Sequence, residues 1–237
     1  MSWGEKRRDE DPSPGTGNPP LSAVFRQSFR SASLTTMSNT NISQKTINIL
    51  LIGIVILGIV LRLQHFSRLP YDGHPMRQTD TESVAYNFAF RNSNILYPQN
   101  SIIRPVSNTE GYFFLEFPSY QYGIGMLYKL FGWHIEIART YNIILYGIAV
   151  LSLYYFLKHF INQQVALFSA FFFTLAPGSI FFFGHAIHPD IFMMTMLLLS
   201  FASYIKWIKS KKLLFFIMAV LTLSLSVATR PFVLIVL

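Results

Sequence analysis

The sequence contains no cysteine, so disulfide bonds and thiolate metal sites are excluded. It is also poor in charge, because Asp, Glu, Lys and Arg make up only 13% of its 237 residues. A typical soluble domain carries about 25%. Hydrophobic residues reach 51% and cluster in long runs instead of alternating with polar ones. The shortage of charge and the long apolar runs favour a protein whose solvent is largely lipid.

Acidic residues are fewer than basic ones, and the formal net charge is +8. In a soluble protein this excess would suggest binding to nucleic acid. Here the basic residues lie mainly in an N-terminal tail and beside the apolar runs, where anionic headgroups and membrane topology account for them. We therefore expect the membrane as a partner and no nucleic acid.

Residues 1–46 form a separate zone, rich in charge and proline, with too little apolar surface to offset the entropy of the chain. This zone is too long and too polar to be a secretory signal. We predict a disordered cytoplasmic tail over 1–46, followed by a membrane domain over 47–237. Met37 is a second possible start, so residues 1–36 could be dispensable.

Five apolar runs follow, and most approach the roughly 20 residues that cross hydrocarbon as a helix. They are Ile47–Phe66, Ala138–Phe160, Val165–Phe183, Ile191–Ile205 and Leu213–Ala228. The polar stretch 67–137 contains a shorter aromatic segment, Ser119–Phe131, which we expect to be interfacial or re-entrant, with Tyr120, Tyr122 and Tyr128 at headgroup depth. The pattern predicts an all-α membrane protein with about five transmembrane helices and an outer loop containing short amphipathic helices.

The distribution of lysine sets the expected orientation. Lys206–Lys212 holds four lysines in seven residues, which is typical of a cytoplasmic loop. By parity, Lys158–Gln164 is also cytoplasmic, while 67–137 and His185–Asp190 lie on the non-cytoplasmic side. All seven acidic residues after the tail then fall on that outer side: Asp72, Asp80, Glu82, Glu110, Glu116, Glu136 and Asp190.

A further apolar run, Phe232–Leu237, stops in mid-pattern. We therefore expect this chain to be the N-terminal portion of a longer protein, with a truncated membrane domain that is inactive alone.

Two polar clusters could carry chemistry on the outer side, 72–82 and His185–Asp190. Thr79 or Asp80 is expected to cap a short helix whose residues Val84, Ala85 and Phe88 share one apolar face. Each cluster also has a plain interpretation as a helix start or a solvated charge.

Three further features stay open at the level of residues. His188 and Asp190 are a thin signal for a metal, so no metal ligand is assigned, although a divalent metal stays open. Arg139 and Arg230 could bind phosphate or extend to headgroups. Glu116 could simply end the outer loop.

Several short motifs, taken in order, resemble polytopic glycosyltransferases of the GT-C superfamily, in the branch of dolichyl-phosphate-mannose–protein mannosyltransferases and lipid A aminoarabinose transferases. The first is Arg77-Gln78-Thr79-Asp80-Thr81 in the first outer loop. The others are Glu116-Phe117-Pro118 with the following Ser119–Gly132, Ala138-Arg139, Ala176-Pro177-Gly178, and His188-Pro189-Asp190. The resemblance runs from about residue 47 to the end and implies a partial GT-C helical bundle.

The resemblance implies a catalytic aspartate in the first outer loop, which corresponds to Asp80. Relatives often have adjacent Asp and Glu there, whereas this chain has Thr81 between Asp80 and Glu82, so Glu82 is a second catalytic candidate. Arg77, Asp190, His188, Arg139 and Arg230 are the candidate substrate-binding residues.

The implied function is inverting transfer of a sugar from a polyprenyl-phosphate donor to a protein, lipid or glycan acceptor at the outer face of a bacterial inner membrane or of the endoplasmic reticulum. The sugar and the acceptor are not fixed by the sequence. Two alternatives remain: a multispan transporter or flippase-like protein, and a non-catalytic membrane scaffold. The span centres lack charge, which disfavours a transporter. For the enzyme, Asp80 and Asp190 should face one outer cavity.

Overall fold

The computed structural model describes residues 43–64, 66–70, 74–101 and 111–235. The predicted disordered tail lies almost entirely outside these residues, and the first helix already begins at Gln44. Over the described part of the chain the structure is helical and has no strand. One antiparallel bridge, between Gln99 and Tyr112, is the exception to helix and turn. The prediction of an all-α protein is confirmed at this level.

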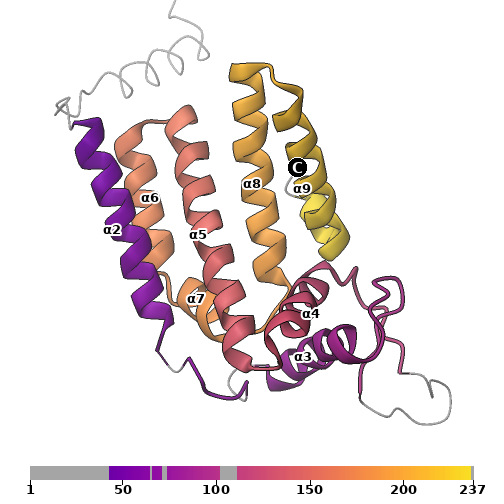
Figure 1. The fold of residues 1–237 in the computed structure, drawn as a ribbon. Helices are drawn as coiled ribbons and strands as arrows, with labels where there is room; N and C mark the ends of the chain where they lie inside the picture. Colours follow the sequence, from indigo (N-terminus) through magenta and orange to yellow (C-terminus); the bar gives the residue numbers. More distant parts are fainter. Residues whose placement is uncertain (1–42, 65, 71–73, 102–110, 236–237) are drawn as a thin grey trace, which may run out of the picture. The chain divides into compact units, whose positions relative to one another are not determined.

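Each of the five predicted apolar runs forms a helix, and the long helices pack side by side as a bundle (Figure 1). The bundle helices are α2 (Gln44–Arg62), α5 (Ile135–Phe160), α6 (Gln163–Leu175), α8 (Asp190–Ser210) and α9 (Leu213–Thr229). The shorter elements are α3 (Pro75–Phe90), α4 (Ser119–Phe131), α7 (Pro177–Ile180), the π-helical turn η1 (Phe181–His185) and the 3₁₀ turn η2 (Pro231–Ile235).

Three helices of the described chain, α2, α5 and α8, are long and apolar enough to cross a membrane. The prediction of five spans needs correction in two places. The run Val165–Phe183 is not one straight helix, because α6 and the α7–η1 pair meet at a bend of 64° and together make at most a fourth span. The fifth, α9, has 17 residues and is a shorter apolar helix.

The break after α6 has a chemical cause. Pro177 has no N–H to donate and its ring clashes with the preceding turn, so the helix stops at Leu175 and restarts in a new direction. The sequence predicts Pro177-Gly178 near the end of a span. In the structure these two residues lie at the bend between α6 and the α7–η1 pair. The π-helical turn then closes with a hydrogen bond from the Ala186 N–H to the Phe181 carbonyl.

Arg62, in the last turn of α2, ties this bent pair to the bundle. Its guanidinium is fully buried and donates to the Gly58 carbonyl at 2.9 Å and to Ser179 Oγ in α7 at 2.7 Å. The same group lies 3.7 Å above the centre of the Tyr146 ring. Hydrogen bonds and a cation–π contact thus compensate a charge at the end of a span, where an unpaired cation would be costly.

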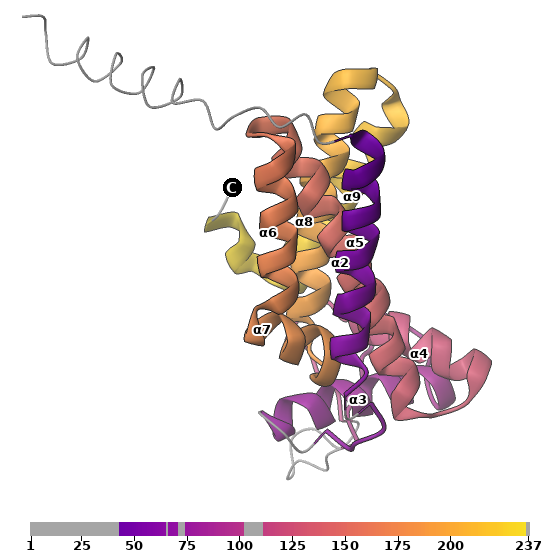
Figure 2. The same cartoon turned by 90° about the vertical axis from the view of Figure 1, so that its left-hand side faces the viewer.

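The two ends of the bundle differ in chemistry (Figures 1 and 2). One end carries the turns α5–α6 and α8–α9 with the lysines at 158, 206, 209, 211 and 212. The other end, called the polar end, carries α3, α4, α7, η1 and the start of α8, and it holds Asp80, Glu82, Glu116, Glu136 and Asp190. For these five acidic residues, the predicted separation from the basic turns is present in the fold, whereas Asp72 and Glu110 lie outside the described residues.

Large apolar side chains on the flanks of the bundle remain exposed, as expected for surfaces that face lipid. On α2 they include Ile49, Ile52, Ile56 and Val60, and on α9 they include most residues of its first half. Together with the span lengths, this supports an integral membrane protein.

Gly58 sets the distance between α2 and α5. A Cβ built on Gly58 would lie 1.8 Å from the Tyr146 hydroxyl, whereas one built on Gly53 of the same helix meets nothing within 4 Å. We expect Gly58→Ala to lower the free energy of unfolding by about 1–3 kcal/mol because Tyr146 must move from under Arg62. Unfolding in mixed micelles measures the effect. Gly53→Ala is the matched control, and equal stabilities for the two variants would contradict this packing.

Candidate functional site

Helix α3 carries both predicted catalytic residues, Asp80 and Glu82, and it begins earlier than expected. Pro75 occupies its first turn, and His74 before it adopts a left-handed backbone with φ of 56°. Thr79 and Asp80 therefore lie inside the helix, and neither side chain caps its N-terminus. Proline suits the first turn because it has no backbone N–H that would need a partner there. Thr79 instead donates its hydroxyl to the Pro75 carbonyl at 2.9 Å.

The predicted apolar face of α3 is confirmed, because Val84, Ala85 and Phe88 are all buried. They face α4, where Gly125 allows close approach: a Cβ there would be 2.8 Å from the Ala85 carbonyl oxygen and from Phe88 Cβ. Tyr128 of α4 is also fully buried in this interface. The rings of Tyr120 and Tyr128 pack inside the protein and not against headgroups, while their depth in the membrane stays a prediction.

Hydrogen bonds hold the turn before α8 against α3, α4 and α5. The Ile187 N–H donates to Gln78 Oε1 of α3 at 3.1 Å. The Tyr120 hydroxyl of α4 donates to Asn142 Oδ1 at 2.7 Å, and Asn142 Nδ2 donates to the Ala186 carbonyl at 2.8 Å. All of these groups are buried. The two predicted polar clusters therefore meet at one end of the bundle.

A chain of ion pairs, called the Glu116 cluster, joins the two regions. Arg77 of α3 donates to Glu116 Oε1, and Gln121 Nε2 donates to the same oxygen at 2.8 Å. Arg230 Nη1 lies 3.1 Å from Glu116 Oε2. These two atoms form an ion pair, but their geometry is not that of a hydrogen bond. Arg230 Nε donates to Asp190 Oδ1 at 2.6 Å, and His188 Nδ1 lies 3.2 Å from Asp190 Oδ2.

Four of the predicted substrate-binding residues, Arg77, Arg230, Asp190 and His188, thus belong to one cluster. Its centre is Glu116, whose side chain is 2% exposed and which the sequence alone left as a loop end. The sequence feature that could have pointed to Glu116 as a site residue is a single carboxylate in an apolar, aromatic stretch. A residue that pairs with both Arg77 and Arg230 cannot be found from sequence spacing.

Asp80 lies beside this cluster rather than in it. Its carboxylate is partly exposed and accepts a hydrogen bond from Asn100 Nδ2 at 2.7 Å. The backbone N–H of Asn100 donates to the Gly111 carbonyl at 2.8 Å, next to the Gln99–Tyr112 bridge, and this hydrogen bond fixes the position of Asn100. Asp80 follows Arg77 by three residues, so the two side chains occupy adjacent turns of α3.

Glu82 is in a different environment from Asp80. Its side chain is buried between α3 and α4, where Tyr128 Oη and Trp133 Nε1 donate to Oε1 at 2.7 and 2.8 Å. Burial raises the pKa of Glu82, although both hydrogen bonds and the charge of Arg139 act in the opposite direction. The same burial and the nearby Glu82 charge raise the pKa of Tyr128.

The raised pKa of Glu82 makes a prediction for stability. The folded state holds this proton to higher pH than the unfolded state, so the contribution of Glu82 is fully present below its ordinary pKa of 4.5. That contribution is lost as pH rises through the folded pKa. We expect the melting temperature of Glu82→Gln to gain on wild type as pH rises above about 4.5. Parallel melting curves across pH would contradict a raised pKa.

Arg139 has a structural setting. It is 2% exposed, and its two terminal nitrogens donate to the backbone carbonyls of Phe66, at 2.6 Å, and Arg68. It thereby anchors the segment that leaves α2 to the start of α5. These contacts favour a positioning role over the predicted contact with phosphate.

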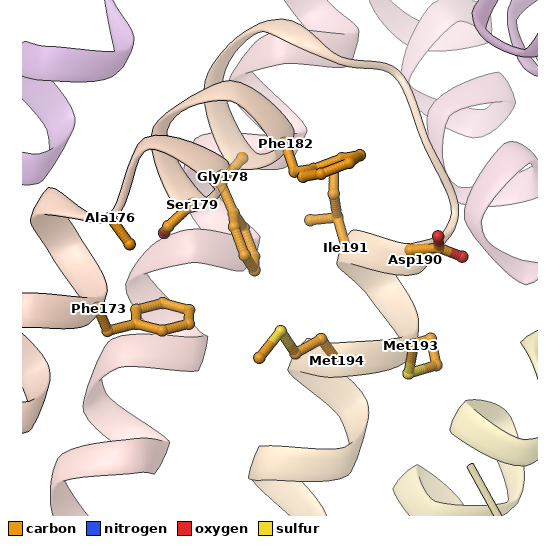
Figure 3. Close-up of a pocket in the computed structure, with 10 residues that line it drawn as sticks. Phe173, Ala176, Gly178, Ser179, Phe182, Asp190, Ile191, Met193 and Met194 are labelled. Carbon is orange, nitrogen blue, oxygen red and sulfur yellow. The ribbon is translucent and has the colours of Figure 1, made fainter. Parts of the chain in front are cut away.

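An apolar cavity of about 270 Å³ opens beside the Glu116 cluster, between the bent pair and α8 (Figure 3). Phe173, Phe182 and Met194 form much of its wall, and Asp190 lies at its edge. Asp80 does not line this cavity. The expectation that Asp80 and Asp190 share one cavity is therefore not met in this structure, although the Glu116 cluster connects their surroundings.

Within the described ranges, no group of three or more His, Asp or Glu side chains is placed to hold a metal ion. The Glu116 cluster offers instead two arginines, two carboxylates and a histidine next to an apolar cavity. Such a site suits an anionic group attached to an apolar chain.

Over the described residues, fold and site together define a helical protein with three or four helices long and apolar enough to cross a membrane, and with a polar end. Comparison of the chain with family models, with curated proteins and with solved structures gives no match.

Proposed function

We propose that the chain is part of a GT-C-type glycosyltransferase that moves a sugar from a polyprenyl-phosphate donor to an acceptor at the non-cytoplasmic membrane face. One observation carries the proposal: an apolar cavity within the bundle end lies beside Arg230 and Asp190, and the Glu116 cluster connects these residues to α3. A lipid-linked donor needs this combination, because its chain stays in hydrocarbon while its phosphate needs cations.

In this proposal Asp80 is the general base. The acceptor oxygen attacks the anomeric carbon from the face opposite the phosphate, its proton passes to Asp80, and the bond from the anomeric carbon to the phosphate oxygen breaks. Arg77 and Arg230 stabilise the charge on the leaving phosphate. Glu116 and Asp190 hold these two guanidiniums when no phosphate is present.

The test is transfer of radiolabelled sugar from polyprenyl-phosphate donors in membranes that carry the complete protein. We expect incorporation that depends on the lipid-linked donor and is not supported by nucleotide sugars. Membranes without the protein provide the background. Absence of incorporation with every polyprenyl-phosphate sugar supplied would overturn the proposal.

The bend at Pro177 favours one alternative, a transporter, because broken helices commonly form substrate sites in transporters. The carboxylates and arginines nevertheless gather at the polar end and not at the centres of the spans, which weakens this alternative. Uptake of a labelled polyprenyl-phosphate sugar into proteoliposomes without change to its glycosidic bond would favour the transporter.

A further inference from the structure

A second cavity lies at the polar end, and Glu82 is among the residues that line it. Its volume is about 490 Å³, within the range of small-molecule sites. Thr79, Glu82, Ser83 and Tyr86 of α3 form one wall, because residues three and four apart share a helix face. The opposite side includes Trp133 together with Leu69, Pro70, Ser101 and Ile135.

Among the described residues that line this cavity, Glu82 is the one carboxylate. The residue is 9% exposed, and its Oε1 is already engaged by Tyr128 and Trp133. Its Oε2 is buried and has no hydrogen-bond partner among the described residues. A buried carboxylate oxygen without a donor is unfavourable, so a ligand hydroxyl that reaches Oε2 after a small shift of the Glu82 side chain toward the cavity would be stabilised there.

The aromatic residues of the cavity are oriented and accessible. The indole N–H of Trp133 is fixed by Glu82, yet 47% of the residue remains exposed. Tyr86 meets the Trp133 ring edge-on, with ring centroids 6.4 Å apart and planes at 82°. A sugar ring has an apolar C–H face that packs on an aromatic surface and hydroxyl groups that donate hydrogen bonds.

We propose that the Glu82 cavity is a binding site for a sugar ring, which stacks on Trp133 and Tyr86 and donates one hydroxyl to Glu82 Oε2. The assignment deepens the proposed sugar transfer and rests on it for its biological role. Glu82 is then a binding residue and not the catalytic residue that the sequence suggested. Asp80, whose carboxylate pairs with Asn100, does not line this cavity and keeps its separate role.

Binding can be measured without any transfer reaction. In a Trp3→Phe/Trp207→Phe variant, Trp133 is the only tryptophan, so its fluorescence reports on this cavity. The protein should be held in lipid nanodiscs, because maltoside detergents carry sugars themselves. Neutral and amino monosaccharides are titrated, with mannitol as an open-chain polyol that lacks a ring face. We expect saturable quenching by at least one monosaccharide and none by mannitol.

Two variants locate the site. Glu82→Gln keeps the shape and an oxygen for Tyr128 and Trp133 but presents an N–H₂ donor in place of Oε2. We expect it to raise the Kd about tenfold or more, the effect of losing a hydrogen bond to a charged group. Tyr86→Ala, which removes an exposed ring, should also weaken binding. Glu136→Gln and Tyr97→Ala are the matched controls, because neither residue lines the cavity.

The outcomes separate this inference from the proposed function. Sugar quenching that Glu82→Gln and Tyr86→Ala weaken, and that both controls preserve, supports the site even if transfer is never detected. No quenching by any monosaccharide, or equal Kd values in Glu82→Gln and wild type, overturns the site. In that case transfer activity in membranes would still stand by itself as support for the proposed function.

Discussion

Asp80→Asn is expected to lower sugar transfer by about a hundredfold to ten-thousandfold, the usual contribution of a general base. The substitution is nearly isosteric, and the Asn oxygen can still accept the hydrogen bond that Asn100 Nδ2 gives to Asp80 at 2.7 Å. What is lost is the ability to take a proton from the acceptor hydroxyl. Initial rates of radiolabelled sugar incorporation measure the effect, at equal amounts of protein in the membrane.

The matched control for Asp80→Asn is Glu136→Gln, which removes another carboxylate at the polar end, on the first turn of α5. We expect that variant to transfer sugar at close to the wild-type rate. Size-exclusion profiles of both variants check that the fold is kept. Wild-type transfer by Asp80→Asn would exclude Asp80 as the base, and it would move attention to the other carboxylates of the polar end.

Glu116→Gln is expected to lower the free energy of unfolding by about 3 kcal/mol or more. The Glu116 side chain is almost fully buried between Arg77 and Arg230, whose own side chains are only 16% and 21% exposed. Gln removes the charge but not the bulk, so two guanidiniums lose their shared counter-charge in a poorly hydrated place. The cost arises from the charges left behind rather than from an intrinsic strength of the pairs.

Denaturation in mixed micelles measures the loss of stability in Glu116→Gln. Gln121→Met offers a graded comparison, since it removes the neutral donor to the same Glu116 oxygen and should cost less. Replacing Glu116, Arg77 and Arg230 together with apolar residues should recover part of the loss, because no buried cation is left without its counter-charge; Asp190, whose side chain is 38% exposed, keeps His188 as a neighbour. A Glu116→Gln variant as stable as Gln121→Met would show that the cluster is well hydrated and of little structural importance.

Much of the architecture was predictable because lipid imposes a simple rule on the chain. Runs of apolar residues must become helices, since only helices satisfy their own backbone groups in hydrocarbon. The predicted runs Ile47–Phe66 and Ala138–Phe160 accordingly appear as α2 and α5, shifted by a few residues at their ends. The apolar face of α3 was predictable for a similar reason, from helical periodicity alone.

The errors arose where the result depends on contacts distant in sequence. Composition could not show the bent form of the third run, because Arg62 of α2 stabilises it through a hydrogen bond to Ser179 of α7. Nor could it show that Tyr120 and Tyr128 face the core, since an aromatic residue suits the membrane interface and a protein interior equally well. The role of Glu116 depends on Arg77 and Arg230, which are far apart in the chain.

The sequence by itself determined that the protein is helical, with apolar helices suited to a membrane, and that the acidic residues described after the tail gather at the end opposite the basic turns. These properties follow from hydropathy and charge, which act locally along the chain. Only the tertiary structure decided which polar residues meet. It joined Arg77, Arg230 and Asp190 through Glu116, left Asp80 beside them, and buried Glu82 against Trp133. The physical reason is that pairing of charges depends on distance in space, which the spacing of residues in the chain does not encode.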